Sequence, residues 1–272
     1  MQKVAVVTGA SRGIGRATAI AFAKAGYHVA ISAREFDNNN TKRHKITHSS
    51  YACGSLLDTV KEIEATGNKA LALRMDLLCP DSINVAVEQV LAYFGRVDVL
   101  INNAIYQGPD LNIPLMEITP QTLEKVAKAY LYAPVQIVQM LIPNMLERNA
   151  GCIINITSGA GEKDPPIPAI DGGWGYAYGA GKAAISRLSG MISTEHGKQG
   201  IRAFTVNPGV VNTETLRATL GDRGVKALGQ AVVEPEIIAE VLLWIATHNE
   251  ADKLQCRTID AQQLASDIDV RR

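Results

Sequence analysis

Apolar segments of strand-like length alternate with segments of helical periodicity along most of this 272-residue chain. The strand-like segments are apolar throughout, which is typical of strands that are buried on both faces. Repeated strand-then-helix units of this kind predict an α/β fold, a doubly wound parallel sheet with helices on both faces. Because 272 residues suffice for one large α/β domain and no linker divides them, we expect a single domain over residues 1–272.

The boundaries of these elements follow from the apolar periodicity and from flanking glycine and proline residues. The expected strands are residues 3–8, 28–33, 69–75, 97–102, 152–157, 201–207 and 254–259. The expected helices are residues 13–26, 55–67, 80–95, 119–149, 178–197 and 234–247. Pro134 lies inside the fourth of these helices, where a proline removes a backbone hydrogen bond, so we expect a bend there.

Three segments do not fit the alternation. Residues 35–54 are polar and carry a basic stretch at 42–45, so we interpret them as an inserted loop. Residues 159–175 are rich in proline and glycine, and residues 210–233 form a long connection that could be partly helical. All three follow strands, so we expect them at the carboxyl edge of the sheet, where open α/β sheets bind ligands. We therefore interpret 159–175 and 210–233 as substrate loops.

The net charge, the apolar runs and the cysteine positions argue against a nucleic-acid partner, a membrane span and a metal site. Lysine plus arginine and aspartate plus glutamate both number 27, whereas nucleic-acid and anionic-membrane binders need a basic surplus, so we expect no nucleic acid partner. No apolar run approaches the roughly 18 residues of a membrane span, and the first residues do not resemble a signal peptide. The four cysteines are placed singly, without metal-site spacing, so we expect no metal and a reducing, cytoplasmic location.

A glycine-rich loop at residues 8–15 (TGASRGIG) joins the first expected strand to the first expected helix. Gly9, Gly13 and Gly15 let the backbone turn tightly and approach a pyrophosphate, which the amides and the dipole at the helix start then bind. The loop therefore predicts a dinucleotide site on a Rossmann-like sheet. The alternative is an ordinary strand–turn–helix connection, which does not explain an arginine at position 12.

At the end of the second expected strand, Ala33 and Arg34 stand where an NAD site usually has an acidic residue that holds both ribose hydroxyls. A carboxylate there would repel a 2′-phosphate, whereas a guanidinium can bind it with two hydrogen bonds. Arg12 can approach the same phosphate from the glycine loop. The residues therefore favour NADP(H) over NAD(H); the alternative is that Arg34 is a solvated loop residue.

Tyr178 and Lys182 are expected one turn apart on one helical face, and Ser158 directly follows a strand. An ammonium beside a phenol favours phenolate, so this tyrosine could transfer a proton near neutral pH. The serine could donate to a carbonyl oxygen that gains negative charge, while the tyrosine delivers a proton and a nicotinamide supplies hydride. Tyr176, the rival phenol, has no lysine at this spacing. The alternative is a chance helical pair.

Taken together, these residues make the chain resemble the classical short-chain dehydrogenase/reductase family over nearly its whole length. The resemblance rests on residues 8–15, Asp76-Leu77, Asn102-Asn103-Ala104, Ser158, Tyr178-x-x-x-Lys182 and Asn207-Pro208-Gly209-x-x-x-Thr213. It implies Ser158, Tyr178 and Lys182 as the catalytic group. It also implies an NADP(H) site formed by Gly9, Ser11, Arg12, Gly13, Ile14, Gly15, Arg34, Asp76, Leu77, Asn103, Tyr178, Lys182, Pro208, Gly209, Val211 and Thr213.

Within this site, the resemblance implies Arg12 and Arg34 on the 2′-phosphate, Asp76 at the adenine and Lys182 on the nicotinamide ribose. It implies Asn103 along the cofactor, and it implies that Val211 and Thr213 contact the nicotinamide carboxamide. A lone aspartate after a strand, such as Asp76, is otherwise more often a turn or cap residue.

The chain departs from the family pattern at several positions. The family usually has an asparagine in the long fourth helix, which supports a water-mediated proton relay from the lysine; Tyr130 stands in that place, so we expect a rerouted relay or reduced turnover. The stretch between Ser158 and Tyr178 is longer than usual, which we expect to reshape the substrate mouth. Residues 260–262 replace an Asp-Gly-Gly that often packs between subunits; we expect a homo-oligomer, a dimer or a tetramer.

The residues thus predict an NADP(H)-dependent oxidoreductase that interconverts a small-molecule carbonyl compound and its alcohol, with tyrosine as proton donor or acceptor. The alternative, which Tyr130 favours, is an NADP(H)-binding sensor or scaffold with weak or lost catalysis. Ile105, Tyr106, Trp174 and Leu216 indicate an apolar or bulky carbonyl compound, although each could equally serve packing. An epimerase or dehydratase fits less well, because 272 residues leave little room for its larger substrate domain.

Overall fold

A sheet of seven parallel strands forms the centre of the molecule, in the order β3-β2-β1-β4-β5-β6-β9. This computed structural model describes residues 2–36, 54–218 and 232–270. The strands of the sheet are β1 (Val4–Thr8), β2 (His28–Ala33), β3 (Ala70–Arg74), β4 (Val99–Asn102), β5 (Gly151–Ile156), β6 (Ile201–Asn207) and β9 (Thr258–Asp260). In the register of β1, Val7 pairs with Ile31 of β2 and with Ile101 of β4. The predicted doubly wound parallel sheet is confirmed.

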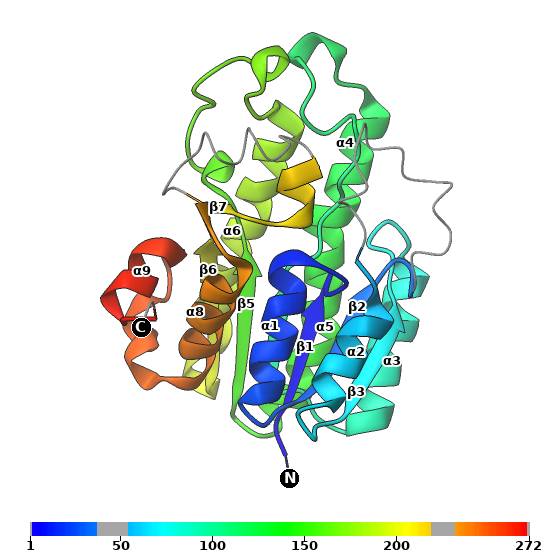
Figure 1. Ribbon diagram of the computed structural model, residues 1–272, viewed down its shortest axis with the longest axis vertical. Helices are drawn as coiled ribbons and strands as arrows, with labels where there is room; N and C mark the ends of the chain where they lie inside the picture. The colour runs from blue at the N-terminus through cyan, green and yellow to red at the C-terminus, as the bar shows by residue number, and fades with distance from the viewer. Residues whose placement is uncertain (1, 37–53, 219–231, 271–272) are drawn as a thin grey trace.

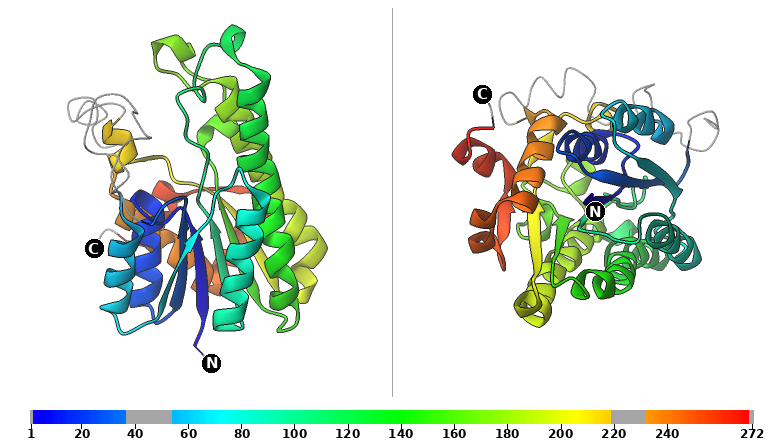
Figure 2. Two further views of the ribbon diagram at one scale, coloured as in Figure 1. Left: turned by 90° about the vertical axis from the view of Figure 1, so that its right-hand side faces the viewer. Right: turned by 90° about the horizontal axis from the view of Figure 1, so that it is seen from below.

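Helices cover both faces of this sheet (Figure 1). The helices are α1 (Gly13–Lys24), α2 (Leu56–Glu64), α3 (Pro80–Phe94), α4 (Pro120–Val126), α5 (Ala133–Leu146), α6 (Tyr176–His196), α8 (Pro235–Thr247) and α9 (Ala261–Asp267). Figure 2 shows helices on both sides of the sheet. One buried cluster joins α1, α2 and α8 to the sheet, and a second joins α3, α5 and α6 to its other face. Across the described residues, no helix combines the length and apolarity needed to span a membrane.

Shorter elements connect these layers. A π-helical segment, η3 (Ala127–Tyr132), joins α4 to α5, and β7 (Val210–Val211) pairs with β8 (Val232–Val233) as a small second sheet. The short 3-10 helices are η2 (Leu115–Glu117), η4 (Gly159–Gly161), η5 (Ala169–Asp171), η6 (Gly197–Gln199) and η8 (Asn249–Leu254).

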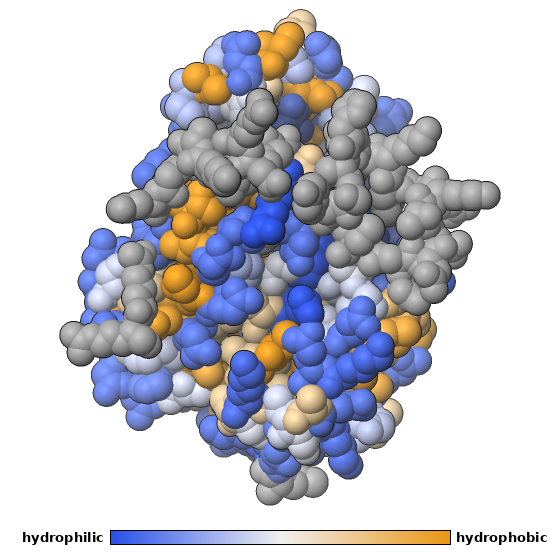
Figure 3. Space-filling view, in the orientation of Figure 1, coloured by the Kyte–Doolittle hydropathy of each residue, from blue (hydrophilic) through white to orange (hydrophobic). Residues whose placement is uncertain are grey.

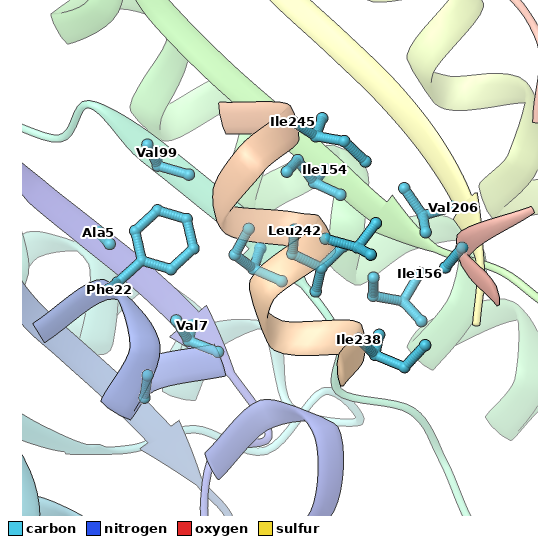
Figure 4. Close-up of a cluster of buried hydrophobic side chains, with 14 of the residues drawn as sticks. Ala5, Val7, Phe22, Val99, Ile154, Ile156, Val206, Ile238, Leu242 and Ile245 are labelled. Atoms are coloured by element: carbon cyan, nitrogen blue, oxygen red, sulfur yellow. The ribbon is translucent and has the colours of Figure 1, made fainter. Parts of the chain in front are cut away.

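Packing of apolar side chains fixes the position of α1 and α8 on the sheet. Phe22 of α1 and Leu242 and Ile245 of α8 are buried against strand residues such as Val7 and Ile154 (Figure 4). Full burial of such a side chain stabilises the fold by roughly 1.5–3 kcal/mol. Because α1 begins directly after the loop that follows β1, this packing holds its N-terminus at the carboxyl edge of the sheet.

The structure divides one predicted element, shortens another, and adds α9 and the β7–β8 pair, which were not predicted. The expected helix over 119–149 is divided into α4, η3 and α5, and the π-helical segment ends just before Pro134, which has no N–H to continue the helical pattern. The last strand, expected over 254–259, is the shorter β9, because residues 249–254 form η8. The basic stretch 42–45 and most of the inserted loop lie outside the described residues.

Two long loops rise above the carboxyl edge of the sheet. The connection from β4 to α4 and the connection from β5 to α6 form the upper end of the molecule in Figure 1. They contact each other directly, because the Gly175 N–H donates to Asn112 Oδ1 at 3.0 Å. This contact places the predicted substrate loop 159–175 beside the segment that follows Asn102.

Candidate active site

The glycine loop after β1 is held by contact with the end of β4. Gly9 and Gly13 have positive φ angles of 70° and 54°, which glycine adopts without a steric penalty. A Cβ at Gly15 would lie 2.3 Å from the Gly9 carbonyl oxygen, so no side chain fits there. Asn103 Nδ2 donates to the carbonyl oxygens of Thr8 at 2.9 Å and Gly9 at 3.1 Å. Asn103, predicted to lie along the cofactor, therefore also shapes the loop.

The first amide of α1 bonds an anionic group of the chain itself. The Gly13 N–H donates to Glu214 Oε2 at 3.0 Å, whereas the side chain of Arg12, at the N-cap position, forms no capping hydrogen bond. Glu214 follows Thr213, whose Cγ2 would lie 3.0 Å from a Cβ at Gly13. The predicted cofactor residue Thr213 thus lies beside the glycine loop, and the next residue brings a carboxylate that sequence reasoning missed.

Arginines gather where the 2′-phosphate is predicted to bind. Arg34 is exposed directly after β2. Arg74, the last residue of β3, pairs with Ala33, and its Nε donates to the Arg34 carbonyl oxygen at 3.2 Å. Arg12 lies on the glycine loop against Gly54, where a Cβ would lie 2.6 Å from Arg12 Cβ. Sequence reasoning missed Arg74 because its place beside Ala33 depends on the register of two strands.

The residues predicted at the adenine follow β3. Leu77 is buried, and Asp76 Oδ1 accepts from the Leu78 N–H at 3.0 Å. Asp76 therefore has the local turn role that a lone aspartate often plays, at the position where the cofactor role is predicted. Ser11 and Ile14, the remaining glycine-loop candidates, are half-buried.

Ser158, Tyr178 and Lys182 converge at the carboxyl end of β5. Ser158 lies within reach of Tyr178, and its side chain acts to lower the pKa of that phenol. One turn further along α6, Lys182 Nζ donates to the Ile156 carbonyl oxygen at 2.9 Å and lies 5.9 Å from the centroid of the Tyr178 ring. Thr157 Oγ1 donates to the Lys182 carbonyl oxygen at 3.1 Å, which docks α6 onto β5 at this point.

Burial governs the protonation of this group. Lys182 is 3% exposed, and burial lowers its pKa to about 7. Burial also raises the pKa of Tyr178, and Ser158 offsets only part of that rise. The prediction of a lowered pKa for Tyr178 is therefore wrong, because burial disfavours the charged form of the phenol and also of the amine beside it. At neutral pH the phenol keeps its proton.

Tyr130 lies against Tyr178 and Lys182. It is 1% exposed, and its hydroxyl donates to the Tyr106 carbonyl oxygen at 2.8 Å. Its ring meets the Tyr178 ring edge to face, with centroids 6.5 Å apart, and Lys182 Nζ lies 5.8 Å from its centroid. Burial raises the pKa of Tyr130, so its hydroxyl remains a donor. The ring of Tyr130 therefore contacts Tyr178 and Lys182, while its hydroxyl is bonded to the Tyr106 carbonyl oxygen.

The segment after β6 is braced from the C-terminal part of the chain. Gln262 Nε2 donates to the carbonyl oxygens of Pro208 at 3.3 Å and Val210 at 3.1 Å. A Cβ at Gly209, which has a φ of 68°, would lie 2.3 Å from the same nitrogen. The predicted cofactor residue Val211 is buried in β7. Gln262, where the chain departs from the family's glycine, thus supports the turn that carries these candidates.

Within residues 2–36, 54–218 and 232–270, no three or more His, Cys, Asp or Glu side chains gather so that they could hold a metal ion.

Comparison with known sequences identifies relatives of the chain. The family model described as short chain dehydrogenase matches residues 3–53 and 42–223. A short chain dehydrogenase of Pseudocercospora fijiensis (strain CIRAD86) is 34% identical over 215 residues, which are 78% of this chain and 60% of that protein. A cyclohexanol dehydrogenase of Rhodococcus sp. (strain TK6) is 32% identical over 228 residues, 82% of this chain and 79% of that protein.

Solved structures share the fold. A metagenomic short-chain oxidoreductase in complex with NADP has a TM-score of 0.71 at 30% identity, covering 94% of this chain and 95% of that one. L-sorbose reductase from Gluconobacter frateurii, complexed with NADPH and L-sorbose, has a TM-score of 0.78 at 26% identity, covering 95% and 94%. A short chain dehydrogenase from Mycobacterium paratuberculosis bound to NAD has a TM-score of 0.74 at 27% identity, covering 95% of each chain. With the family model and the sequence relatives, the chain belongs to the short-chain dehydrogenase/reductase family of oxidoreductases.

Proposed function

We propose that this chain uses NADP(H) to interconvert a small-molecule carbonyl compound and its alcohol, with Tyr178 as the proton donor or acceptor. The observation that carries the proposal is the buried amine of Lys182, which lies 5.9 Å from the centroid of the Tyr178 ring, together with Ser158, whose side chain acts on the pKa of the same phenol. This group lies at the carboxyl end of β5, the edge of a parallel sheet at which ligands bind.

The residues at this edge suit a dinucleotide. Positive φ angles at Gly9 and Gly13 let the backbone turn tightly, and α1 begins there with its amides and the positive end of its dipole. In this proposal the loop 9–15 holds the pyrophosphate, and Lys182 holds the nicotinamide ribose. The other cofactor-binding residues are Ser11, Arg12, Ile14, Arg34, Arg74, Asp76, Leu77, Asn103, Pro208, Gly209, Val211 and Thr213.

The proton chemistry follows from burial. When bound, the dinucleotide supplies or accepts the hydride. In the reducing direction, Tyr178 keeps its proton because burial raises its pKa, and it donates that proton to the carbonyl oxygen of the substrate. Ser158 orients this oxygen and stabilises the negative charge that develops on it. Lys182, charged below its pKa of about 7, stabilises the phenolate that remains on Tyr178.

The preference for NADP(H) over NAD(H) rests on charge. Arg34 and Arg74 meet at the ends of β2 and β3, and Ala33 stands where an acidic residue would hold the ribose hydroxyls of NAD. Guanidinium groups bind phosphate with paired hydrogen bonds. Because the solved relatives include complexes with NADP, NADPH and NAD, family membership alone does not decide between the cofactors.

The substrate is proposed to be an apolar or bulky carbonyl compound. Tyr106 and Trp174, both half-buried, belong to the two long loops above the sheet. Farther out on the first of these loops, Leu115 is 68% exposed and Met116 is 93% exposed. Figure 3 shows hydrophobic surface at this upper end of the molecule. An apolar approach to the site favours substrates with apolar bodies over small polar ones.

The test is NADPH oxidation, followed by absorbance, against a panel of aldehydes, ketones and quinones. Turnover that is present in the wild type and absent in Tyr178→Phe supports the proposal. NADPH binding without turnover on any member of the panel contradicts it and supports the alternative, an NADP(H)-binding sensor or scaffold. The placement of Tyr130 against the catalytic pair is the structural feature that favours this alternative.

We also propose a homo-oligomer, a dimer or a tetramer, in the cytoplasm. Leu123 of α4 and Leu131 of η3 are exposed apolar side chains about two turns apart, which suits a subunit contact. Singly placed cysteines suit a reducing compartment. Sedimentation equilibrium and cell fractionation test these two statements separately; a monomer at all concentrations contradicts the first, and recovery outside the cytoplasmic fraction contradicts the second.

A further inference from the structure

We propose that Tyr130 is a positioning residue of the reaction, which couples the catalytic pair Tyr178 and Lys182 to the segment 103–110 on the substrate side. The inference rests on the proposed function and deepens it. Tyr130 lies on η3, the π-helical segment between α4 and α5, and acts through its neighbours.

The ring of Tyr130 packs against both members of the catalytic pair. It meets the ring of Tyr178 edge to face, at an interplanar angle of 88°. The Lys182 amine lies over the same ring, 5.8 Å from its centroid, and 5.9 Å from the centroid of Tyr178. Because the amine lies within 6 Å of both ring centroids and the two rings contact each other, a displacement of Tyr130 displaces the amine, the proton-donating ring, or both.

Gly181 provides the space that the Tyr130 ring occupies. A Cβ at Gly181 would lie 2.8 Å from Tyr130 Cγ and 2.9 Å from Tyr130 Cδ1. Both separations are shorter than an ordinary contact between carbon atoms, which is about 3.5–4.0 Å. The tyrosine at 130 and the glycine at 181, the residue directly before Lys182, are therefore complementary, and the catalytic turn of α6 is shaped around this ring.

The hydroxyl of Tyr130 connects the tyrosine ring to the segment 103–110. Its bond to the Tyr106 carbonyl oxygen, at 2.8 Å, holds the middle of the segment. At one end, Asn103 binds the glycine loop. At the other end, Asp110 Oδ1 accepts from the Tyr106 hydroxyl at 2.5 Å, and Asp110 Oδ2 accepts from Lys125 Nζ at 2.9 Å. Tyr130 is thus the link between this braced segment and the catalytic residues.

The hydrogen bonds around Asp110 keep its carboxylate ionised. Burial acts to raise the pKa of Asp110, but hydrogen bonds from Tyr106 and Lys125 prevail and bring it down to about 2. The carboxylate therefore stays ionised and keeps its hydrogen bonds from Tyr106, Lys125 and Thr122. Since the ends of the segment are held independently, loss of the Tyr130 hydroxyl releases its middle without unfolding it.

The first test removes the hydroxyl and keeps the ring. With the best carbonyl substrate of the panel, Tyr130→Phe is expected to raise KM about 3–10-fold, the usual effect of one lost hydrogen bond, with kcat and NADPH affinity within about twofold. Tyr132→Phe, on the same segment but 60% exposed, is the matched control and should leave KM unchanged. Loss of thermal stability alone, with KM and kcat unchanged, would assign Tyr130 a merely structural role and overturn the inference.

The second test uses the complementarity of Tyr130 and Gly181. Gly181→Ala is expected to lower kcat about tenfold or more, because the added methyl group must displace the ring. In a Tyr130→Ala background the same substitution should cost kcat less than about twofold. Gly190→Ala, on the same helix but with no atom within 4 Å of its Cβ, is the control and should leave kcat unchanged. An equal loss of kcat on Gly181→Ala in the wild-type and Tyr130→Ala backgrounds would overturn the coupling. If Tyr130→Ala does not fold, the kinetics of Tyr130→Phe decide whether Tyr130 is a positioning residue.

Failure of the inference differs from failure of the proposed function. If the wild type reduces no carbonyl compound, the proposed function fails and the inference fails with it. If the wild type reduces one and Tyr130→Phe behaves like Tyr132→Phe, only the positioning role is overturned.

Discussion

Gly54 lies directly against the backbone of Ser11, so closely that a Cβ on Gly54 would be 2.2 Å from the Ser11 carbonyl oxygen. Ser11 belongs to the glycine loop, whereas Gly54 precedes the N-cap of α2. The chain that returns from residues 37–53 thus rejoins the fold against the proposed cofactor site. The contact is between backbone atoms, which cannot move aside as a flexible side chain can.

We therefore predict that Gly54→Ala weakens NADPH binding about tenfold or more, because overlap with a carbonyl oxygen typically costs 1–3 kcal/mol in displaced backbone. Fluorescence titration with NADPH measures the effect. Gly197→Ala is the control, since no atom lies within 4 Å of a Cβ at Gly197. An unchanged affinity in Gly54→Ala would show that the glycine loop can shift without consequence for the cofactor.

Arg34→Asp is expected to shift the cofactor preference toward NAD(H). Loss of a charged hydrogen-bond donor, about 1.5–3 kcal/mol, should lower the ratio of NADPH to NADH affinity roughly 10–100-fold. Arg34→Lys keeps the positive charge and should retain most of the preference. Binding constants for both cofactors provide the comparison, which needs no substrate. An unchanged ratio of NADPH to NADH affinity in Arg34→Asp would refute the role of Arg34 at the 2′-phosphate. Arg74→Ala would then test whether Arg74 has that role instead.

Tyr178→Phe is expected to abolish turnover, by about 10²–10⁴-fold, while NADPH affinity stays within a few fold, because only the proton donor is lost. Tyr176→Phe is the matched control: this tyrosine lies two residues earlier on α6 but is 61% exposed. Steady-state kinetics with the best carbonyl substrate decide the matter. Equal activity of the two variants would remove the catalytic assignment of Tyr178.

Lys182→Met is expected to change how stability depends on pH. The folded-state pKa of Lys182, about 7, lies below the unfolded value near 10.4, so between these values the unfolded chain binds a proton that the folded chain does not. The free energy of unfolding therefore gains up to about 1.4 kcal/mol per pH unit from this lysine as pH rises through that window. Denaturant titrations at several pH values should show the slope in the wild type and in Lys198→Met, an exposed control, and lose it in Lys182→Met. A slope that persists in Lys182→Met would mean that the amine is not held in its neutral form.

Glu214→Gln is expected to strengthen NADPH binding about 3–10-fold. The Glu214 carboxylate bonds the first amide of α1 at 3.0 Å, and a negative charge near a pyrophosphate costs roughly 1 kcal/mol even in water. Glutamine keeps an oxygen acceptor for Gly13 and removes the charge. Glu236→Gln is the control, because Glu236 lines the surface pocket that Gly13 and Glu214 also line. Weaker NADPH binding in Glu214→Gln would show instead that the carboxylate supports the cofactor site.

Much of the sheet was predictable, because apolar strands between helical segments carry their signal locally. β2 and β6 agree with the predicted ranges at both ends. The division of the fourth helix was only partly predictable: Pro134 indicates an interruption, but the π-helical turn at 127–132 depends on how Tyr130 packs. Among the site candidates, Ser158, Tyr178 and Lys182 were found from spacing, while Arg74, Glu214 and Gln262 were not, because their neighbours lie far away in the chain.

The α/β class, the glycine loop and the spacing of Tyr178 and Lys182 could be read from residue order, since they depend on helical or strand periodicity. The protonation of those side chains depends on how the whole chain packs. Burial, which no local pattern encodes, lowers the pKa of Lys182 to about 7 and raises that of Tyr178, against the expectation from their proximity. Long-range packing likewise places the ring of Tyr130 in the space at Gly181, because contacts between distant segments depend on how whole elements meet.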